Sequence, residues 1–217
     1  RDSYLTDQDG LPNYTVYKIF KDSRNMMWIG TFNGICRFDG HSFTKFHIDL
    51  PKPLNAVTDI VETHEGHIMF GTRKGLYLVE PERQTCVQVC PQISFVNCIG
   101  KIGQTLLIGS ANGLWVYKNP EEAEPIKFEN SVISKGNIVN DITDDGKGEM
   151  AVQDEFLIHL NLKDRSLKKY KISKDLLTGN LRNICRGGDR IYIGTRNSGL
   201  LVFDPSTAST EPYIDLD

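Results

Sequence analysis

The chain has 217 residues, of which 39% are hydrophobic and 24% charged, and its formal net charge is −3. This composition is typical of a folded globular protein, and the small net charge gives no overall attraction to nucleic acid or to an anionic membrane. No apolar stretch approaches the ~18 residues of a membrane-spanning helix. Because the sequence begins with Arg1 and no signal pattern follows, we expect that any targeting segment has been removed.

One short phrase, two apolar residues followed by Gly-Thr and then a second glycine, recurs along the chain. Clear copies occupy residues 28–35, 69–76, 107–114 and 192–200, and the third has Ser in place of Thr. A degenerate copy at residues 150–157 has Val152 and Phe156 where the others have glycine. Neighbouring copies lie 38 to 43 residues apart, so the sequence predicts five structural repeats.

A second element precedes each phrase by a nearly constant number of residues. It is a pair of apolar residues three apart, ten or eleven residues before the first glycine position of each copy. The five pairs are Val16/Ile19, Val57/Ile60, Val96/Ile99, Val139/Ile142 and Leu181/Ile184. Turn-forming residues fill the interval, so each unit is predicted to begin as strand, turn, strand.

The predicted strands of the first unit are residues 14–20, 26–31, 35–39 and 43–48. The second and third strands are joined by Asn33-Gly34, which is a strong hairpin signal because both residues tolerate a positive φ. Later units repeat this order with turns at Gly75, Gly113 and Gly199, and no helical periodicity of useful length is present. The third strands are apolar on both faces, which indicates sheets that are covered on both sides.

These features predict an all-β fold, a β-propeller made of four-stranded antiparallel blades, with about five blades in this chain. We expect one propeller domain or propeller fragment over residues 1–217. The blades are predicted near residues 11–50, 51–91, 92–131, 132–174 and 175–217. Five blades can close a ring, but the chain could also be part of a larger propeller.

Several patterns that resemble catalytic or metal sites have simpler interpretations. The Gly-Thr-x-x-Gly phrase lacks the Gly-Lys-Ser/Thr of a phosphate-binding loop and is followed by a strand. His64 and His67 form a pair in a predicted turn, whereas catalytic zinc usually has three protein ligands. Asp59 and Asp141 are the acids at a repeated inner-strand position. We therefore expect no catalytic residues, no metal and no cofactor.

The five cysteines do not indicate a metal site either, since no Cys-x-x-Cys motif is present. An odd number cannot all pair within the chain, and we expect buried free thiols that pack as small apolar residues. The cysteines are Cys36, Cys86, Cys90, Cys98 and Cys185.

Candidate ligand-binding residues lie in the predicted loops on one rim of the propeller. Sugar binding uses amides, arginines and acids for the hydroxyl groups and aromatic faces for the sugar ring. The candidates are Tyr14, Phe32, Asn33, Arg73, Lys74, Asn112, Arg196 and Asn197. The alternative is that turn geometry alone selects the asparagines there. A basic cluster at residues 163–171 is expected to serve solubility, with contact to an anionic glycan or a partner as the alternative.

The first unit closely resembles the two-component regulator propeller repeat. The residues that carry the resemblance are Asp9-Gly-Leu-Pro, Val16-x-x-Ile19, Asp22 and Trp28-Ile-Gly-Thr-x-x-Gly-Ile-x-Arg-Phe-Asp39-Gly40. In that family, such propellers are often seven-bladed and form the periplasmic sensor region of Bacteroides-type hybrid two-component receptors, and many detect oligosaccharides. The resemblance therefore implies that this chain is part of a larger propeller of seven blades. The resemblance covers essentially the whole chain and is weakest in the fourth copy.

The resemblance implies a periplasmic domain that performs no reaction itself. It would bind an oligosaccharide or other small ligand and control a histidine kinase and a transcriptional output elsewhere in the parent protein. Its partners would be the remaining propeller and linker domains, with a homodimer as a further possibility, and this region would contact no nucleic acid and span no membrane. Two alternatives stay open: a protein-interaction or dimerisation propeller without a small ligand, and a propeller hydrolase or lyase.

Overall fold

A computed structural model describes residues 6–126, 138–144, 149–153, 155–164 and 166–213. Apart from the short 3-10 helix η1 (Asp7–Asp9), the regular elements of these residues are strands. They form five antiparallel four-stranded sheets, each built from four strands consecutive in sequence. The predicted all-β fold is confirmed.

The strands follow the order of the repeats. The first two sheets contain β1 (Val16–Lys21), β2 (Met27–Thr31), β3 (Gly34–Phe38) and β4 (Phe43–Phe46), then β5 (Val57–Glu62), β6 (Ile68–Thr72), β7 (Leu76–Glu80) and β8 (Thr85–Val89). The third contains β9 (Val96–Ile102), β10 (Thr105–Ser110), β11 (Gly113–Asn119) and β12 (Glu122–Pro125). The last two contain β13 (Asp141–Asp144), β14 (Glu149–Gln153), β15 (Phe156–Asn161) and β16 (Ser166–Lys171), then β17 (Leu181–Gly187), β18 (Arg190–Thr195), β19 (Leu200–Asp204) and β20 (Ser209–Pro212).

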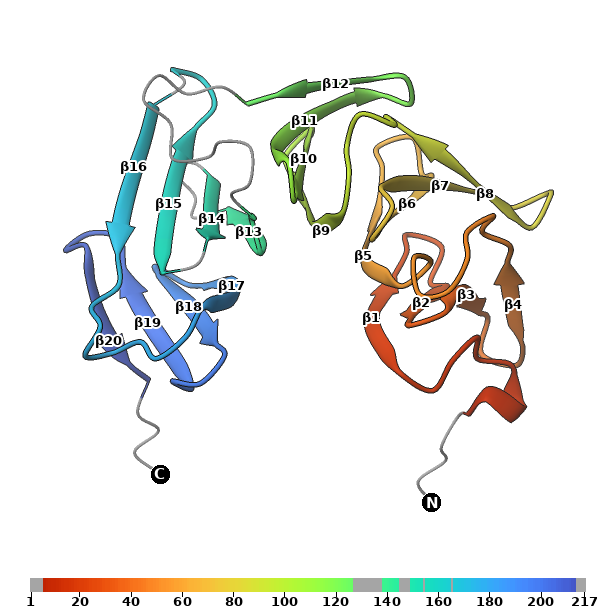
Figure 1. Ribbon diagram of the computed structural model, residues 1–217, viewed down its shortest axis with the longest axis horizontal. Helices are drawn as coiled ribbons and strands as arrows, with labels where there is room; N and C mark the ends of the chain where they lie inside the picture. The colour runs from red at the N-terminus through yellow and green to blue at the C-terminus, as the bar shows by residue number, and fades with distance from the viewer. Residues whose placement is uncertain (1–5, 127–137, 145–148, 154, 165, 214–217) are drawn as a thin grey trace.

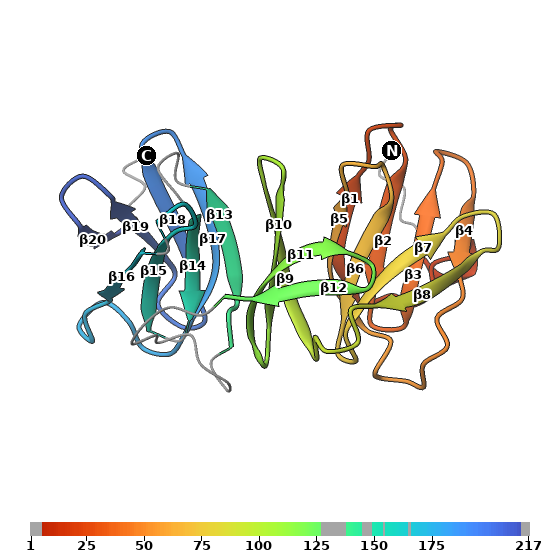
Figure 2. The same ribbon diagram turned by 90° about the horizontal axis from the view of Figure 1, so that it is seen from above.

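The five sheets stand side by side in an arc that is open between the first and the last (Figure 1). The first strand of each sheet, β1, β5, β9, β13 and β17, lies on the inner side of the arc, and neighbouring members of this set contact each other. Figure 2 shows these strands upright across the molecule. The blade boundaries stay a prediction, and parts of the predicted blades 92–131, 132–174 and 175–217 lie outside the described residues.

The Gly-Thr phrase forms the hairpin between the second and third strands. The Thr31 hydroxyl donates a hydrogen bond of 2.9 Å to the Gly34 carbonyl, and Gly34 has a φ of 102° that suits glycine. Thr72 and Ser110 make the same bond to Gly75 and Gly113. The repeated hydroxyl therefore closes a tight turn, as the sequence predicts.

The first glycine of the phrase makes room for the apolar pair of the next sheet. A Cβ atom at Gly30 would lie 2.5 Å from Val57, and one at Gly71 would lie 2.5 Å from Val96. Such contacts are too short for any larger side chain, so the valine of one repeat fits against the glycine of the preceding repeat. This packing explains why the Gly-Thr phrase and the apolar pair recur together at a nearly fixed spacing. It also places the hydrophobic core between neighbouring sheets.

All five cysteines are free, but their environments differ. Cys36, Cys90 and Cys98 are buried, whereas Cys86 is half-buried. The expectation of a buried thiol is wrong for Cys185, which is exposed.

Candidate functional site

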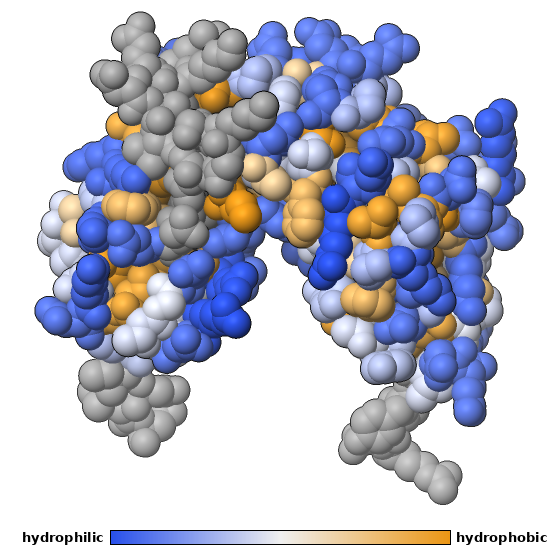
Figure 3. All heavy atoms as spheres, viewed as in Figure 1, coloured by the Kyte–Doolittle hydropathy of each residue, from blue (hydrophilic) through white to orange (hydrophobic). Residues whose placement is uncertain are grey.

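A cavity of about 450 Å³ opens on the inner side of the arc. Its lining residues are Tyr17, Ala56, Thr58, Arg73, Phe95, Asn97, Asn140, Arg182 and Asn183. They come from all five repeats, and the space-filling view shows the hollow that the arc encloses (Figure 3). A ligand in this cavity would therefore contact every sheet of the chain.

Five of the lining residues occupy the same position of the repeat, directly after the first member of the apolar pair. We call them the cavity row: Tyr17, Thr58, Asn97, Asn140 and Arg182. In the first, second, third and fifth sheets the strand pairing shifts register at this position. Such β-bulges leave one residue unpaired and turn its side chain, and they are frequent next to binding sites. The bulge therefore explains why Tyr17, Thr58, Asn97 and Arg182 face the cavity, whereas Asn140 directly precedes β13.

The next residue of each repeat forms a second set, which we call the bridging row: Lys18, Asp59, Cys98, Asp141 and Asn183. Asp59 accepts a 2.8 Å hydrogen bond from the Ile99 amide in the following sheet. It also forms an ion pair with Lys18 in the preceding sheet, with 2.7 Å between the charged atoms. Asp59 thus connects three sheets. It is also buried, so its carboxylate is committed to these contacts.

Asp141 repeats this arrangement between the fourth and fifth sheets. Its carboxylate accepts hydrogen bonds from the Ile184 amide at 2.9 Å and from Asn183 at 3.4 Å. Burial raises the pKa of Asp141 above its ordinary value, and the hydrogen bonds from the backbone amides oppose that rise. Cys98 lies between the two acids in the row, and burial raises the pKa of its thiol strongly. The bridging row is therefore built to join sheets.

The polar side chains of the cavity row differ in whether the fold itself uses them. Thr58 and Asn140 bond to backbone carbonyls of the next sheet, at 2.7 and 2.9 Å. In contrast, the side-chain nitrogen of Asn97 is buried and has no hydrogen-bond partner among the described residues. A buried unpaired donor is costly unless a ligand or water satisfies it. Asn97 thus offers an unused donor at the cavity.

Two arginines also line the cavity without a partner among the described residues. Arg73 comes from the hairpin turn after β6, and Arg182 from the bulge of β17. Both side chains are exposed, and neither makes a hydrogen bond or an ion pair within the part of the chain that the structure describes. Their guanidinium groups are free to bind a ligand.

Two aromatic rings complete the lining. Tyr17 is 50% exposed and meets Phe32 edge to face, with 6.3 Å between the ring centroids. Phe95 is 39% exposed and has a φ of +42°, which is unusual for a bulky residue. Backbone strain of this kind clusters at functional sites. The cavity therefore combines aromatic faces with amide and guanidinium donors.

The predicted rim residues are distributed unevenly around this cavity. Arg73 lines it, and Phe32 supports Tyr17 from behind. Asn33 lines a different cavity, described below. The remaining candidates line neither cavity: Tyr14, Lys74, Asn112, Arg196 and Asn197. Asn112 has a structural part in its turn, since its amide donates to the Gln92 carbonyl at 3.0 Å.

Sequence reasoning missed the whole cavity row, although a signal was present. Side chains in a regular strand alternate between faces, so two residues three apart cannot share a face without an extra residue between them. Val57 and Ile60 are both buried against Gly30 of the preceding sheet. The spacing of the apolar pair therefore indicated a bulge, and with it the residue that leaves the strand.

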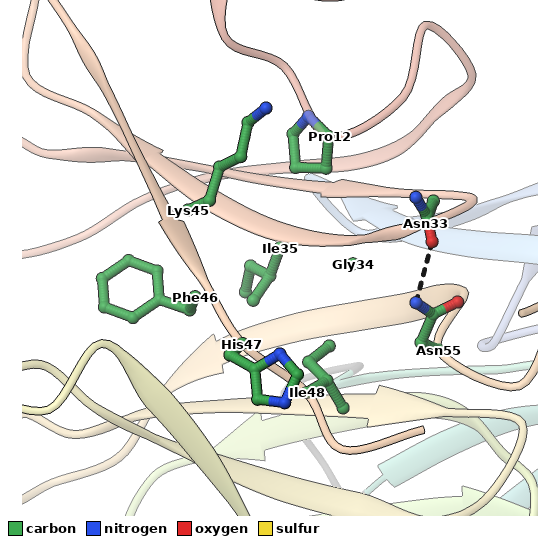
Figure 4. Close-up of a pocket in the computed structure, with 9 residues that line it drawn as sticks. All are labelled: Pro12, Asn33, Gly34, Ile35, Lys45, Phe46, His47, Ile48 and Asn55. Carbon is green, nitrogen blue, oxygen red and sulfur yellow. Dashed lines mark hydrogen bonds between the residues drawn. The ribbon is translucent and has the colours of Figure 1, made fainter. Parts of the chain in front are cut away.

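A second cavity, of about 380 Å³, lies between the first and second sheets (Figure 4). Asn33 and Asn55 meet across its edge in a hydrogen bond of 2.8 Å, and Lys45 and His47 extend from the neighbouring strand end. Only two repeats contribute to this cavity. It lacks the convergence of all five repeats that distinguishes the inner cavity.

Other candidate features of the sequence do not assemble into sites. His64 and His67 are exposed, and the described residues contain no group of histidine, cysteine and acidic side chains suited to a metal ion. In the basic cluster, Lys171 pairs with Glu155 at 3.1 Å and Lys169 lies 3.3 Å from the Phe156 ring centroid. Arg165 lies outside the described residues. No helix among the described residues is long and apolar enough to cross a membrane.

Comparison with known proteins supports the resemblance found in the sequence. The family model "two component regulator propeller" matches residues 10–33, whereas no curated protein matches the chain. Residues 10–33 include Trp28, whose indole donates a 2.8 Å hydrogen bond to Asp22, so two motif residues of the repeat are in direct contact.

Solved structures with the same fold include two proteins of Bacteroides thetaiotaomicron. The extracellular domain of the putative hybrid two component system BT4673 matches with a TM-score of 0.77 and 17% identity over 91% of this chain and 27% of that chain. The corresponding domain of BT3049 matches with a TM-score of 0.77 and 20% identity over 96% of this chain and 31% of that chain. The chain thus spans less than a third of either relative.

A fungal protein gives a more distant comparison. The WD40 domain of Neurospora crassa Pan2 matches with a TM-score of 0.66 and 13% identity over 95% of this chain and 69% of that chain. At such identities the likeness shows the propeller fold alone. Together, these findings show that the chain has a β-propeller fold and that its residues 10–33 match the two component regulator propeller model, as the resemblance suggested.

Proposed function

We propose that the chain is the ligand-sensing domain of a hybrid two-component receptor, and that it binds an oligosaccharide in the inner cavity. The observation that carries the proposal is the cavity row, through which all five repeats contribute to one cavity. Binding would be reported to a histidine kinase and a transcriptional output elsewhere in the parent protein. Signalling requires that the ligand favours one arrangement of the domains over another.

The chemistry of the lining supports a sugar ligand. Sugar rings stack their apolar faces on aromatic side chains, and their hydroxyl groups pair with amides and guanidinium groups. Tyr17 and Phe95 supply exposed rings, while Asn97 supplies a buried donor without a partner. This combination is the one expected for a polar ligand with apolar faces.

The proposed location is the periplasm, as the extracytoplasmic part of an inner-membrane receptor. The similar solved structures are extracellular domains of two-component systems, and their chains are more than three times as long as the part matched here. Val16 and Ile19 are 38% and 57% exposed, whereas the equivalent pairs of the other four sheets are buried. Further blades of the parent propeller would cover this face.

The structure also offers an observation in favour of the alternative, a protein-interaction or dimerisation propeller. The exposed side of β1 presents the apolar pair Val16 and Ile19, and an apolar strand face of this kind also suits a protein partner or a second copy. A hydrolase or lyase receives less support, because Asp59 and Asp141 already accept hydrogen bonds from the next sheet.

Thermal unfolding with a panel of neutral and acidic oligosaccharides tests the proposal. A ligand at about 100 times its dissociation constant stabilises by about 2.7 kcal/mol, which corresponds to roughly 5–10 °C for a chain of this size. The expected result is a rise with one glycan class. No rise with any member, together with concentration-dependent dimerisation, would favour the interaction propeller instead.

The variant Phe95→Gly connects the response to the inner cavity. Glycine accepts the φ of +42° without strain, so the variant removes the ring and preserves the backbone. Loss of a stacking ring is worth about 1 kcal/mol or more, so we expect affinity to fall about fivefold or more. Tyr14→Ala is the matched control, because Tyr14 is 80% exposed and lies outside the cavity lining. Equal losses in both variants would contradict this site.

A further inference from the structure

We infer that the ligand of the inner cavity is anionic, an acidic sugar that carries carboxylate or sulfate groups. The inference rests on the proposed function and names the chemical class of its ligand. Its basis is the pair of guanidinium groups, Arg73 and Arg182, that line one cavity without a partner of their own among the described residues.

The charge of the cavity is unbalanced. Among the described residues, its lining contains two arginines and no acidic side chain. The nearest acids by sequence position, Asp59 and Asp141, belong to the bridging row and are committed to amide donors and to Lys18. The two guanidinium groups of the lining therefore have no carboxylate beside them in the cavity among the described residues, and a ligand anion could supply one.

The chemistry of arginine makes this charge selective. A guanidinium group presents planar, paired donors that match a carboxylate or a sulfate, and hydrogen bonds between charged groups are about twice as strong as neutral ones. A neutral sugar would use the same donors only weakly. Neither arginine side chain makes a hydrogen bond or ion pair with the described part of the chain, so the contacts seen there give no structural reason for their presence in the cavity.

The positions of the two arginines in the repeat also support an anionic ligand. Arg182 occupies the bulge position of the fifth repeat, where the other repeats have Tyr17, Thr58, Asn97 and Asn140. Arg73 projects from a hairpin turn, two residues after the glycine that packs against Val96. Two unrelated parts of the repeat thus deliver positive charge to one cavity, alongside the unpaired donor of Asn97.

The test compares matched acidic and neutral oligosaccharides of equal length. Pairs include tetragalacturonate with galactotetraose, a sulfated galactan tetrasaccharide with its desulfated form, and glucuronoxylan with xylan oligosaccharides. We expect at least tenfold tighter binding for the acidic member of one pair, with the carboxylate and sulfate pairs distinguishing the two kinds of anion. Affinity for that member should fall as salt rises, because salt screens exposed charges.

The variants Arg73→Gln and Arg182→Gln test whether the two arginines are responsible. Each should weaken binding of the acidic sugar about tenfold or more, while unfolding temperatures stay unchanged. Lys74→Gln and Arg196→Gln remove one charge each from exposed neighbouring positions outside the lining, and they should have little effect.

The outcomes separate the inference from the proposed function. Binding of neutral sugars alone, or equal binding of both members of every pair, overturns the anionic ligand and leaves the sugar sensor in place. Equal losses in the arginine variants and their controls also overturn it, because net charge rather than the cavity would then govern binding. No binding by any sugar contradicts both proposals.

Discussion

Two adjacent positions on the inner strand of each repeat have opposite uses. In the bridging row, Asp59 and Asp141 accept hydrogen bonds from the next sheet. One residue earlier, in the cavity row, Arg182 has no partner among the described residues and Asn97 has an unpaired donor. In the third and fifth repeats, the inner strand thus presents an unpaired polar group at the cavity-row position and places a bridging-row residue directly after it.

The bulge accounts for this difference. By inserting an extra residue, it keeps both apolar residues of the pair on the face that packs against the preceding sheet, and it leaves one side chain outside the pairing. Asn97 and Arg182 make no side-chain hydrogen bond to another sheet among the described residues, whereas Thr58 and Asn140 do. Substitution at Asn97 or Arg182 should therefore leave the contacts between sheets in place. A propeller built in this way can change its ligand without changing its fold, which separates the residues for stability from the residues for binding.

The largest expected effect comes from Asp59→Ala in the bridging row. This variant leaves the buried amide of Ile99 without an acceptor, and we expect a loss of about 2–4 kcal/mol and a fall in unfolding temperature of about 5–15 °C. The ion pair contributes little of this loss, because the Lys18 side chain is 42% exposed. Thermal denaturation measures the change.

Arg182→Ala is the matched control from the cavity row, with an expected change within about 0.5 kcal/mol. Equal losses in both variants would show that the two rows do not differ.

A smaller, pH-dependent effect is expected for Asp141→Asn. Burial raises the pKa of Asp141 above its ordinary 3.8, so the folded state holds this proton more tightly than the unfolded state. The contribution of Asp141 to folding therefore falls as the pH rises from below 3.8 through its folded pKa. The stability of the variant relative to the wild type should increase between about pH 4 and pH 7, as measured by urea denaturation. A difference that stays constant with pH would contradict the buried carboxyl group.

Sequence reasoning predicted the fold more fully than the site. The repeated glycines and apolar pairs could be recognised in the sequence because they pack against each other. Gly30, for example, lies so close to Val57 of the next sheet that a larger side chain would not fit. Arg73 was identified because turn geometry does not explain an arginine there, and it lines the cavity. Arg182 was missed because its position depends on a bulge, and Phe95 because its unusual φ is a property of the folded backbone.

The variant Asn97→Leu tests the central claim, that the cavity row binds the ligand. It removes a buried donor that has no partner among the described residues, so stability should stay equal or rise. Calorimetric titration should use the oligosaccharide that stabilises the wild type most. We predict that the affinity of the variant falls about tenfold or more while its unfolding temperature does not fall. Unchanged affinity in a stably folded variant would contradict the account, because the ligand would then bind elsewhere.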